Sequence, residues 1–383
     1  MKQISFITLL TLMVGLSATA QTIDINAVLR SIADNNKSLK ALKQANAANI
    51  SQLEADNTLG ATSVEYSPFF RKGVSGTSSS ELIVSQEFKL SNVYASQRKA
   101  ITLQRDVDNK AYDIALRDLM TEAQAICYDL QSAMQNATLL KQRKDATDSL
   151  LTICYKQLSH GNATIMDLNR VKLDSMSLQS DLISTQTEIS QARIALIKLG
   201  ASEKALKAND NVAPSTNTVD IPKSAELRYA DATLTQANQE LKVSKQGWLP
   251  TLTVGYRRNT ELHEASNGPL IGVAIPLFSN SRKIKAARMR QSAAQLAVED
   301  ATYQLNTQRQ ALQSEAHSLE LKMQAYDLSL MQQSLNTLMR AVSTGELSIS
   351  EYYLEANKIY TIIQEKITVE NRYNKVRAQL ETF

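Results

Sequence analysis

The sequence contains few of the residues that interrupt helices: 11 glycines and 6 prolines in 383 residues. Two long segments, 77–199 and 281–383, lack proline altogether, and each has a single glycine, Gly161 in the first and Gly345 in the second. Proline breaks helices and glycine weakens them. Each segment is therefore predicted to form a helical hairpin with unusually long arms, which turns at its glycine.

Aromatic residues are also scarce, at 5% of the chain with one Trp, and this composition is typical of long helices rather than of ordinary globular packing. The two cysteines, Cys127 and Cys154, are both predicted on one helix. Their spacing corresponds to roughly 40 Å along a helix, which is far beyond the reach of a disulfide. We expect both to be buried free thiols.

Charge of one sign does not dominate. The chain has 42 basic and 38 acidic residues mixed throughout, which argues against a basic face for nucleic acid. His160, His263 and His317 do not stand at ligand spacing with Cys, Asp or Glu, and the sequence has no glycine-rich phosphate loop. We therefore expect a protein that is not an enzyme and needs no metal or cofactor.

One long hydrophobic run is present, at the N-terminus, in "MKQISFITLLTLMVGLSATA". It has a Lys at position 2, an apolar core from Ile4 to Leu16, and the Ala18-Thr19-Ala20 pattern before Gln21. Residues 1–20 are therefore predicted to be a signal peptide, so the protein is exported. No other segment approaches the ~18 consecutive apolar residues of a membrane-spanning helix.

Apolar residues recur at three- and four-residue spacing in both long segments. One stripe comprises Ala115, Leu119, Ile126, Leu130, Ala133, Ala137 and Leu140, and the other comprises Ala294, Val298, Ala301, Leu305, Leu312, Ala316, Leu319, Met323, Tyr326 and Leu330. Polar residues fill the positions between, so one stripe of each helix is predicted to be buried. The first long helix, from about Val93 to Leu158, would span roughly 95 to 100 Å.

The chain also repeats itself. "LGATSVEY" (59–66) aligns with "LPTLTVGY" (249–256), and further along Gly161 aligns with Gly345, Ile165 with Ile349 and Asp167 with Glu351. This predicts a first structural repeat at 21–199, a linker at 200–222 and a second repeat at 223–383. Each repeat is predicted to contain a helix, a strand pair and a long helical hairpin, with its tip at 160–163 or 344–347.

The strand pairs are predicted at 61–70 and 80–89, and at 250–258 and 269–277. Leu252, Val254 and Tyr256 alternate with polar or small residues and define one face of their strand. In 80–89 it is ambiguous which side chains form the apolar face, because Leu82, Val84 and Ile83 are all apolar. Strands of about 9 to 10 residues can cross a bilayer when tilted.

Four strands cannot close a barrel, and open strand edges in hydrocarbon leave backbone groups unpaired. Several copies of the chain would therefore have to contribute to one barrel. Three copies would supply twelve strands, an even number within the range of outer-membrane barrels.

"GWLPTLTVGY" (247–256), followed by "GPLIGVAIPLFSNSRKIKAARMR" (268–290), resembles the outer membrane efflux protein family, the TolC-like channels. Asn36-Lys37 stands where the family's Asn-Pro helix start is usual, and the resemblance covers 24–383. It implies a homotrimer whose twelve strands form one outer-membrane β-barrel continuous with a periplasmic α-helical barrel. It also implies a passive efflux or export channel that contacts outer-membrane lipid and works with a periplasmic adaptor and an inner-membrane pump.

The resemblance also suggests site residues. Asp167 and Glu351, each six residues beyond a turn glycine, match the position of the family's acidic periplasmic gate. The alternative is that each carboxylate only stabilises the start of the returning helix. The tips, with Gly161, Asn162, Gly345, Glu346 and Leu347, match the segments that contact the adaptor.

Tyr352, Tyr353 and Tyr360 follow the second tip, and packing between helices is their expected use, with pore closure as the alternative. A different reading of the whole chain is a secreted periplasmic coiled-coil scaffold or adhesin without a pore. That reading explains the helices but leaves the duplicated strand pairs without a role.

Overall fold

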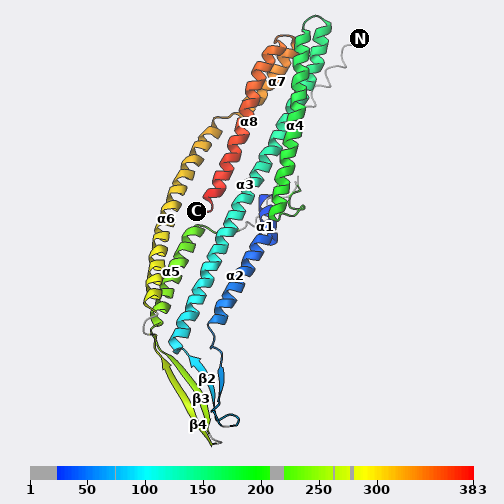
Figure 1. Cartoon of the computed structure of the whole chain (residues 1–383). Helices are drawn as coiled ribbons and strands as arrows, with labels where there is room; N and C mark the ends of the chain where they lie inside the picture. Colours follow the sequence, from blue (N-terminus) through cyan, green and yellow to red (C-terminus); the bar gives the residue numbers. More distant parts are fainter. Residues whose placement is uncertain (1–23, 74, 208–219, 262–263, 277–279) are drawn as a thin grey trace. The chain divides into compact units, whose positions relative to one another are not determined.

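The computed structural model of the chain describes residues 24–73, 75–207, 220–261, 264–276 and 280–383 (Figure 1). The predicted signal peptide, His263, most of the predicted linker, and Leu277 and Phe278 lie outside the described residues. In chain order the elements are α1 (Ile25–Asn35), α2 (Lys37–Asp56), β1 (Ser63–Phe69), β2 (Ser79–Phe88), α3 (Ser91–Ser159), α4 (Ile165–Leu199), α5 (Ala225–Gln246), β3 (Thr251–Glu261), β4 (Glu264–Ala274), α6 (Ser281–Gln324), α7 (Leu328–Thr344) and α8 (Ile349–Leu380). The fold is mainly α-helical with four antiparallel strands, as the sequence predicted.

The first long helix is confirmed. α3 continues for 69 residues without interruption, and neither proline nor glycine occurs within it. None of the helices in the described part combines the length and the hydrophobicity that a membrane crossing requires.

The second long arm is not one helix, and here the prediction was wrong. α6 ends at Gln324 and α7 begins at Leu328, although no proline or glycine lies between them. The Asp327 side chain accepts a hydrogen bond from the Leu330 N–H at 3.0 Å, so it caps a new helix. The predicted stripe is interrupted there, and Leu330, its last member, is exposed.

The N-terminal helix α1 was also missed. Asp24 caps it by accepting a hydrogen bond from the Ala27 N–H at 3.2 Å, and Val28, Leu29 and Ile32 form its buried face. The chain then becomes extended at Asn36, and α2 begins at Lys37, where the resemblance placed a helix start.

The chain forms two compact units, and each predicted repeat contributes to both. Of the residues that the structure describes, those within Met1–Lys37, Leu116–Lys223 and Gln308–Phe383 form the helical unit, and those within Ser38–Ala115 and Ser224–Thr307 form the strand-bearing unit. α3 and α6 each pass through both units. The two units are described separately below.

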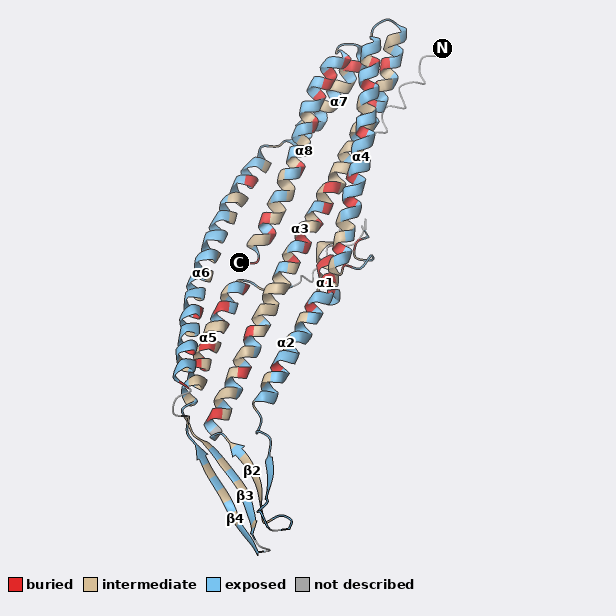
Figure 2. Ribbon diagram, viewed as in Figure 1, coloured by how far each residue is buried: buried red, intermediate tan, exposed pale blue. Residues whose placement is uncertain are grey.

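The helical unit contains two hydrophobic clusters. Figure 2 colours the buried residues of its helices red. The first lies where α1 packs against the middle of α3 and the end of α4, and it includes Leu29, Met120, Cys127 and Leu196. The second, here called the tip cluster, joins the ends of both hairpins. Its buried members are Leu150, Cys154, Leu168, Val171, Val342, Ile349, Tyr352, Tyr353, Ala356 and Tyr360.

The strand-bearing unit combines the sheet with α2, α5 and the first parts of α3 and α6. Polar side chains join neighbouring helices: Asn46 of α2 donates to the Asp108 carbonyl of α3 at 3.0 Å, and Gln239 of α5 donates to the Ser96 carbonyl at 3.0 Å. Several of the buried positions are alanines, among them Ala237 and Ala287. Small residues allow the helices to approach each other closely.

The sheet has the order β1-β2-β3-β4, and all neighbouring strands are antiparallel. β2, from the first half of the sequence, pairs with β3, from the second half, so the two strand pairs form one sheet. Gly255 faces Ser85 at this junction. A Cβ at Gly255 would overlap the Val84 carbonyl oxygen and lie 2.9 Å from Ser85 Cα, so the close approach of β2 and β3 requires glycine.

Candidate functional site

Both hairpins end in the same kind of turn. Gly161 and Gly345 have φ angles of 76° and 81°, in the left-handed region that favours glycine. The Asn162 N–H donates to the Gln157 carbonyl at 2.8 Å, and the Glu346 N–H donates to the Ala341 carbonyl at 2.9 Å. The predicted turn glycines are therefore confirmed as the residues that end α3 and α7.

The tip residues differ in exposure. Gly161, Asn162, Gly345 and Glu346 are exposed, whereas Leu347 is half-buried and packs against the tip cluster. Four of the five residues suggested for adaptor contact are thus accessible in the chain, and Leu347 also contributes to packing.

Asp167 stands at the start of α4 and belongs to a capping box. The Thr164 backbone N–H and hydroxyl donate to Asp167 Oδ2 at 3.0 and 2.6 Å, and the Asp167 N–H donates to Thr164 Oγ1 at 3.1 Å. These hydrogen bonds from Thr164 lower the pKa of the Asp167 carboxyl. The charge therefore persists to lower pH than in an ordinary aspartate.

Glu351 repeats this arrangement at the start of α8. The Ser348 N–H and hydroxyl donate to Glu351 Oε2 at 2.9 and 2.7 Å, and the Glu351 N–H donates to Ser348 Oγ at 3.2 Å. Hydrogen bonds from Ser348 lower the pKa of Glu351 as well. Both carboxylates thus have the helix-starting role that was the alternative to a gate. One oxygen of each takes part in the box.

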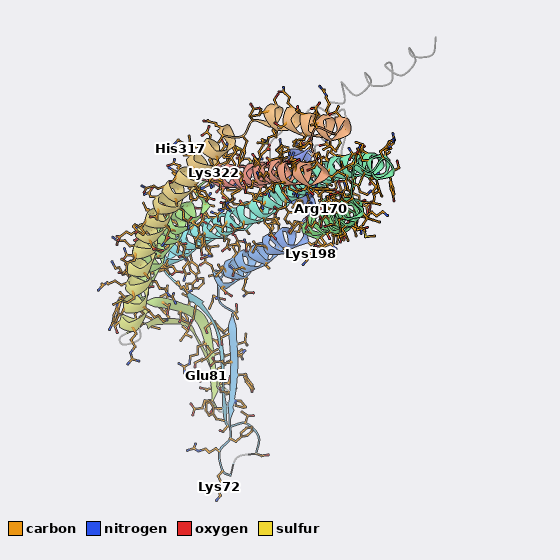
Figure 3. The ribbon with its side chains drawn as sticks, turned by 90° about the horizontal axis from the view of Figure 1, so that it is seen from above. Lys72, Glu81, Arg170, Lys198, His317 and Lys322 are labelled. Carbon is orange, nitrogen blue, oxygen red and sulfur yellow. The ribbon has the colours of Figure 1, made fainter. Side chains whose placement is uncertain are left out.

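The two tips also contact each other through polar side chains. Arg170 of α4, labelled in Figure 3, donates to Ser350 Oγ of α8 at 2.7 Å, and the Ser350 hydroxyl lies 3.5 Å from Asp167 Oδ1. Gln157 of α3 donates to the Val342 carbonyl of α7 at 3.0 Å. These contacts join the first hairpin to the second around the suggested gate residue.

A second polar group links three helices farther from the tips. Arg143 of α3 donates from Nη2 to Asp174 Oδ1 of α4 and to Asn357 Oδ1 of α8, both at 3.0 Å. Thr147 donates to the other Asp174 oxygen at 3.1 Å, and the Arg143 guanidinium lies 5.2 Å from the centre of the Tyr360 ring. Tyr352, Tyr353 and Tyr360 are buried here, which confirms their predicted use in packing between helices.

Several of these residues were not found from the sequence. Thr164 and Ser348 could have been, because each precedes an acidic residue by three positions in the pattern of a capping box. Arg143, Asp174 and Ser350 lie on different helices, and their pairing depends on the relative rotation of those helices, which no local pattern specifies.

The sheet is the second candidate feature, because its two faces differ. Paired residues point to the same side, so Val64, Val84, Tyr256 and Pro269 share one face across all four strands. Leu252, Val254, Ile271 and Val273 extend this face, and most of its large side chains are exposed. The register also shows which side chains of β2 form its apolar face. Leu82 and Val84 belong to that face, and Ile83 belongs to the other.

The opposite face of the sheet is mainly polar. It carries Glu65, Glu81 and Arg257, and Arg257 forms an ion pair with Glu81 across β2 and β3. Figure 3 labels Glu81 on this sheet. Small residues, Gly255 and Gly272, occupy part of the same face.

The two cysteines differ from the two described histidines in burial. Cys127 and Cys154 are buried free thiols, as predicted, and burial raises the pKa of Cys127 to about 12. His160 and His317 are exposed. Within the described ranges no three His, Cys, Asp or Glu side chains gather as a potential metal site.

This combination of a duplicated strand pair and long helical hairpins is the fold of TolC-like outer-membrane channel protomers. A membrane protein from Pseudomonas aeruginosa matches with a TM-score of 0.77 and 15% identity over 95% of this chain and 91% of that one. CusC, whose structures concern folding and transmembrane channel formation, matches with a TM-score of 0.74 and 17% identity. The match covers 94% of this chain and 91% of that one. The Neisseria gonorrhoeae MtrE outer membrane channel matches with a TM-score of 0.68 and 16% identity over 96% and 92%.

Neither the models of known protein families nor the curated protein sequences gave a match to this chain. The similarity to known proteins is therefore one of fold.

Proposed function

We propose that the chain is one protomer of a trimeric outer-membrane channel, the passive duct of an efflux or export system. The observation that carries this proposal is the sheet with one exposed apolar face and one polar face. A strand pair that only stabilised a scaffold would bury its apolar side chains. An outer-membrane strand instead turns them to lipid and its polar side chains to a water-filled interior.

The free edges of the sheet support assembly. In the chain, β1 and β4 each pair on one side only, among the strands described. Each backbone N–H or C=O group that has no hydrogen-bond partner in hydrocarbon costs several kcal/mol. Pairing of β1 with β4 of the next copy removes both edges, and three copies give a closed barrel of twelve strands.

The hairpin tips supply the proposed periplasmic gate. Asp167 and Glu351 have pKa values below the ordinary range and one carboxylate oxygen of each is engaged in a capping box. In a trimer they would contribute six negative charges to one entrance, which favours cations. The contacts of Arg170 and Ser350 near Asp167 would hold the tips together in the closed state.

The same tips are the proposed docking site for a periplasmic adaptor, through Gly161, Asn162, Gly345, Glu346 and the half-buried Leu347. The adaptor connects the channel to an inner-membrane pump, which supplies the energy. The names of the structurally similar proteins, which include an outer membrane channel and a protein of transmembrane channel formation, support the channel part of this proposal.

Membrane fractionation followed by conductance measurement tests the function. We expect the full-length protein in the outer-membrane fraction, resistant to carbonate extraction, and the purified protein in planar bilayers to give discrete cation-preferring currents. Release by carbonate as a monomer with no currents would instead identify a secreted coiled-coil scaffold.

The gate is tested separately with Asp167→Asn and Glu351→Gln together. These amides keep hydrogen-bond acceptors for Thr164 and Ser348 but remove the charges. We expect weaker cation preference and larger single-channel currents than in the unmodified protein. The matched control is Glu346→Gln, which removes a charge from the exposed tip but none from a capping box. Equal selectivity in both variants would exclude Asp167 and Glu351 from the gate.

A further inference from the structure

Basic residues gather where the helices of the strand-bearing unit meet the sheet (Figure 1). The segments 88–105, 241–250 and 281–298 contain the first parts of α3 and α6 and the end of α5, and none of them contains an acidic residue. We call their basic residues the basic collar. It comprises Lys89, Arg98, Lys99, Arg105, Lys242, Lys245, Arg282, Lys283, Lys285, Arg288 and Arg290. Without these 11, the 42 basic residues of the chain become 31, against 38 acidic residues, so the charges are not mixed evenly along the chain.

Most of the basic collar has no acidic partner. All its members are exposed. Arg105 forms an ion pair with Glu54 at 2.7 Å, and Arg290 lies 3.8 Å from Glu240. The other nine form no ion pair with another described residue. α3 and α6 also begin beside the sheet, so the positive ends of their helix dipoles add to the same potential. Such a concentration of unpaired positive charge favours an anionic ligand.

The collar surrounds α6 and does not form a single face of it. Five of its members lie within 282–290. Successive residues of a helix are about 100° apart, so these five are distributed around α6 except on the side that Ala287 buries. A face that packs on one neighbouring helix would carry its charges on one side. Charge on all exposed sides instead fits a layer of anionic groups that the helix meets at its end.

The position of the collar along the chain is that of a membrane boundary in the proposed channel. Lys89 follows β2 directly, and the neighbouring strand segments 251–256 and 265–274 contain no charged residue. Trp248, the one tryptophan of the sequence, lies between Lys245 and β3 and is 44% exposed. Tryptophan is enriched where membrane meets water. The collar therefore lies at the level of lipid headgroups on the helical side of the sheet.

A groove between α3 and α5 holds three members of the collar. It has a volume of about 520 Å³ and is lined by Ala95, Ser96, Lys99, Gln239, Lys242, Lys245 and Gln246. Its charged lining residues are the three lysines. Gln246 Oε1 is buried and accepts no hydrogen bond from the described residues. The groove thus offers cations for a phosphate and a free acceptor for a hydrogen-bond donor on the same ligand.

We propose that the basic collar binds headgroups of anionic glycerophospholipids, and that the groove holds one of them. The phosphodiester accepts hydrogen bonds from the three lysines, and a headgroup hydroxyl, as in phosphatidylglycerol, donates to Gln246 Oε1. Basic residues beside a membrane-embedded element attract anionic lipid in this way. The choline headgroup carries the same phosphate but also a cation, which the lysines repel. This inference rests on the proposed function, which places the sheet in a membrane, and it adds the class of lipid and its site.

Spin-labelled lipids test the inference with the full-length protein in phosphatidylcholine vesicles. Electron paramagnetic resonance measures the fraction of labelled phosphatidylglycerol, or of labelled phosphatidylcholine, that is immobilised at the protein. We expect phosphatidylglycerol to be favoured about threefold. Combined Lys99→Gln, Lys242→Gln and Lys245→Gln should remove most of this preference. The matched control, Lys141→Gln with Lys204→Gln and Lys207→Gln, removes three exposed lysines from the helical unit and should leave the preference unchanged.

The possible outcomes separate the lipid site from the proposed channel. Equal preference in the unmodified protein and in the groove variant would overturn the groove assignment. Loss of the preference with sodium phosphate, but not with sodium chloride of the same ionic strength, would assign the groove to free phosphate instead of lipid. Immobilised lipid of both kinds without any preference would overturn the collar alone. No immobilised lipid of either kind would overturn the membrane placement and with it the proposed function.

Discussion

At each hairpin tip one glycine adopts a backbone conformation that other residues rarely adopt. No atom lies within 4 Å of the position that a Cβ would occupy at Gly161 or Gly345, so space does not exclude a side chain. Only the positive φ requires glycine. Substitutions at these two turns therefore measure the free-energy cost of the left-handed backbone conformation by itself.

Gly161→Ala and Gly345→Ala should each destabilise the helical unit by roughly 1 to 2 kcal/mol, the cost of the left-handed conformation for an L-residue. Gly161→Asn should cost less, because Asn tolerates this conformation. Thermal unfolding followed by circular dichroism measures the difference. Gly60→Ala is the control, since Gly60 has open space and no positive φ. Equal melting temperatures for all variants would contradict the prediction.

The capping carboxylates predict a pH dependence. Folding lowers the pKa of Asp167 and Glu351 below their ordinary values of 3.8 and 4.5. Their stabilisation is therefore complete above these values and is lost as the pH falls through the lower, folded pKa. We expect the melting temperature of the unmodified protein to fall more steeply below about pH 4 than that of Asp167→Asn with Glu351→Gln. Parallel curves would show that ionisation of these two carboxyl groups does not contribute to stability.

The sequence alone predicted the turn glycines, because glycine scarcity made two isolated glycines informative. It also located the two carboxylates, but it left open whether they start helices or line a gate. The structure shows the first role and leaves the second as a proposal, since a gate is formed only when copies assemble. The Arg143 and Arg170 contacts could not be predicted, because each depends on the rotation of one helix relative to another.

Among the elements, the two long arms differ although they belong to repeats. α3 is continuous, whereas the second arm is divided into α6 and α7 by the segment 325–327. The Ala325 and Tyr326 N–H groups donate to carbonyls three residues earlier, at 3.2 and 3.3 Å, so the end of α6 tightens before Asp327 starts α7. Apolar spacing continued across this point, which is why the sequence predicted no break.

Replacing Asp327 tests what maintains the break. Asp327→Ala removes the N-cap of α7 and should destabilise the helical unit by about 1 kcal/mol. Asp327→Ser keeps a capping oxygen and should restore most of the loss. Hydrogen exchange of the Leu330 amide, the group that Asp327 accepts from, should accelerate in the Ala variant only. Unchanged exchange in both variants would mean that packing, and not the cap, fixes the start of α7.

At the scale of the whole molecule, the two halves of the sequence meet in one sheet. Gly255 lies at their junction and has no room for a side chain. Repetition in the sequence predicted both strand pairs, and the structure adds that β2 and β3 join them. That pairing could not be predicted from the sequence, because strands far apart in the chain carry no local signal of their register.

Gly255→Ala should disrupt the junction, with a cost of about 1 to 3 kcal/mol from overpacking. We expect reduced recovery of the protein in the outer-membrane fraction and a lower temperature for dissociation of the assembled protein. Gly268→Ala is the matched control, because nothing lies within 4 Å of the added Cβ there. Recovery of Gly255→Ala at the control level would contradict a requirement for glycine at the junction.

The two buried thiols can report separately on the opening of the two hydrophobic clusters of the helical unit. Cys127 belongs to the cluster around α1 and Cys154 to the tip cluster, and each is at most 1% exposed. A thiol reagent should therefore label neither residue until its own cluster opens. The labelling rates of Cys127 and Cys154 then report separately how fast each of the two clusters opens, without any introduced probe.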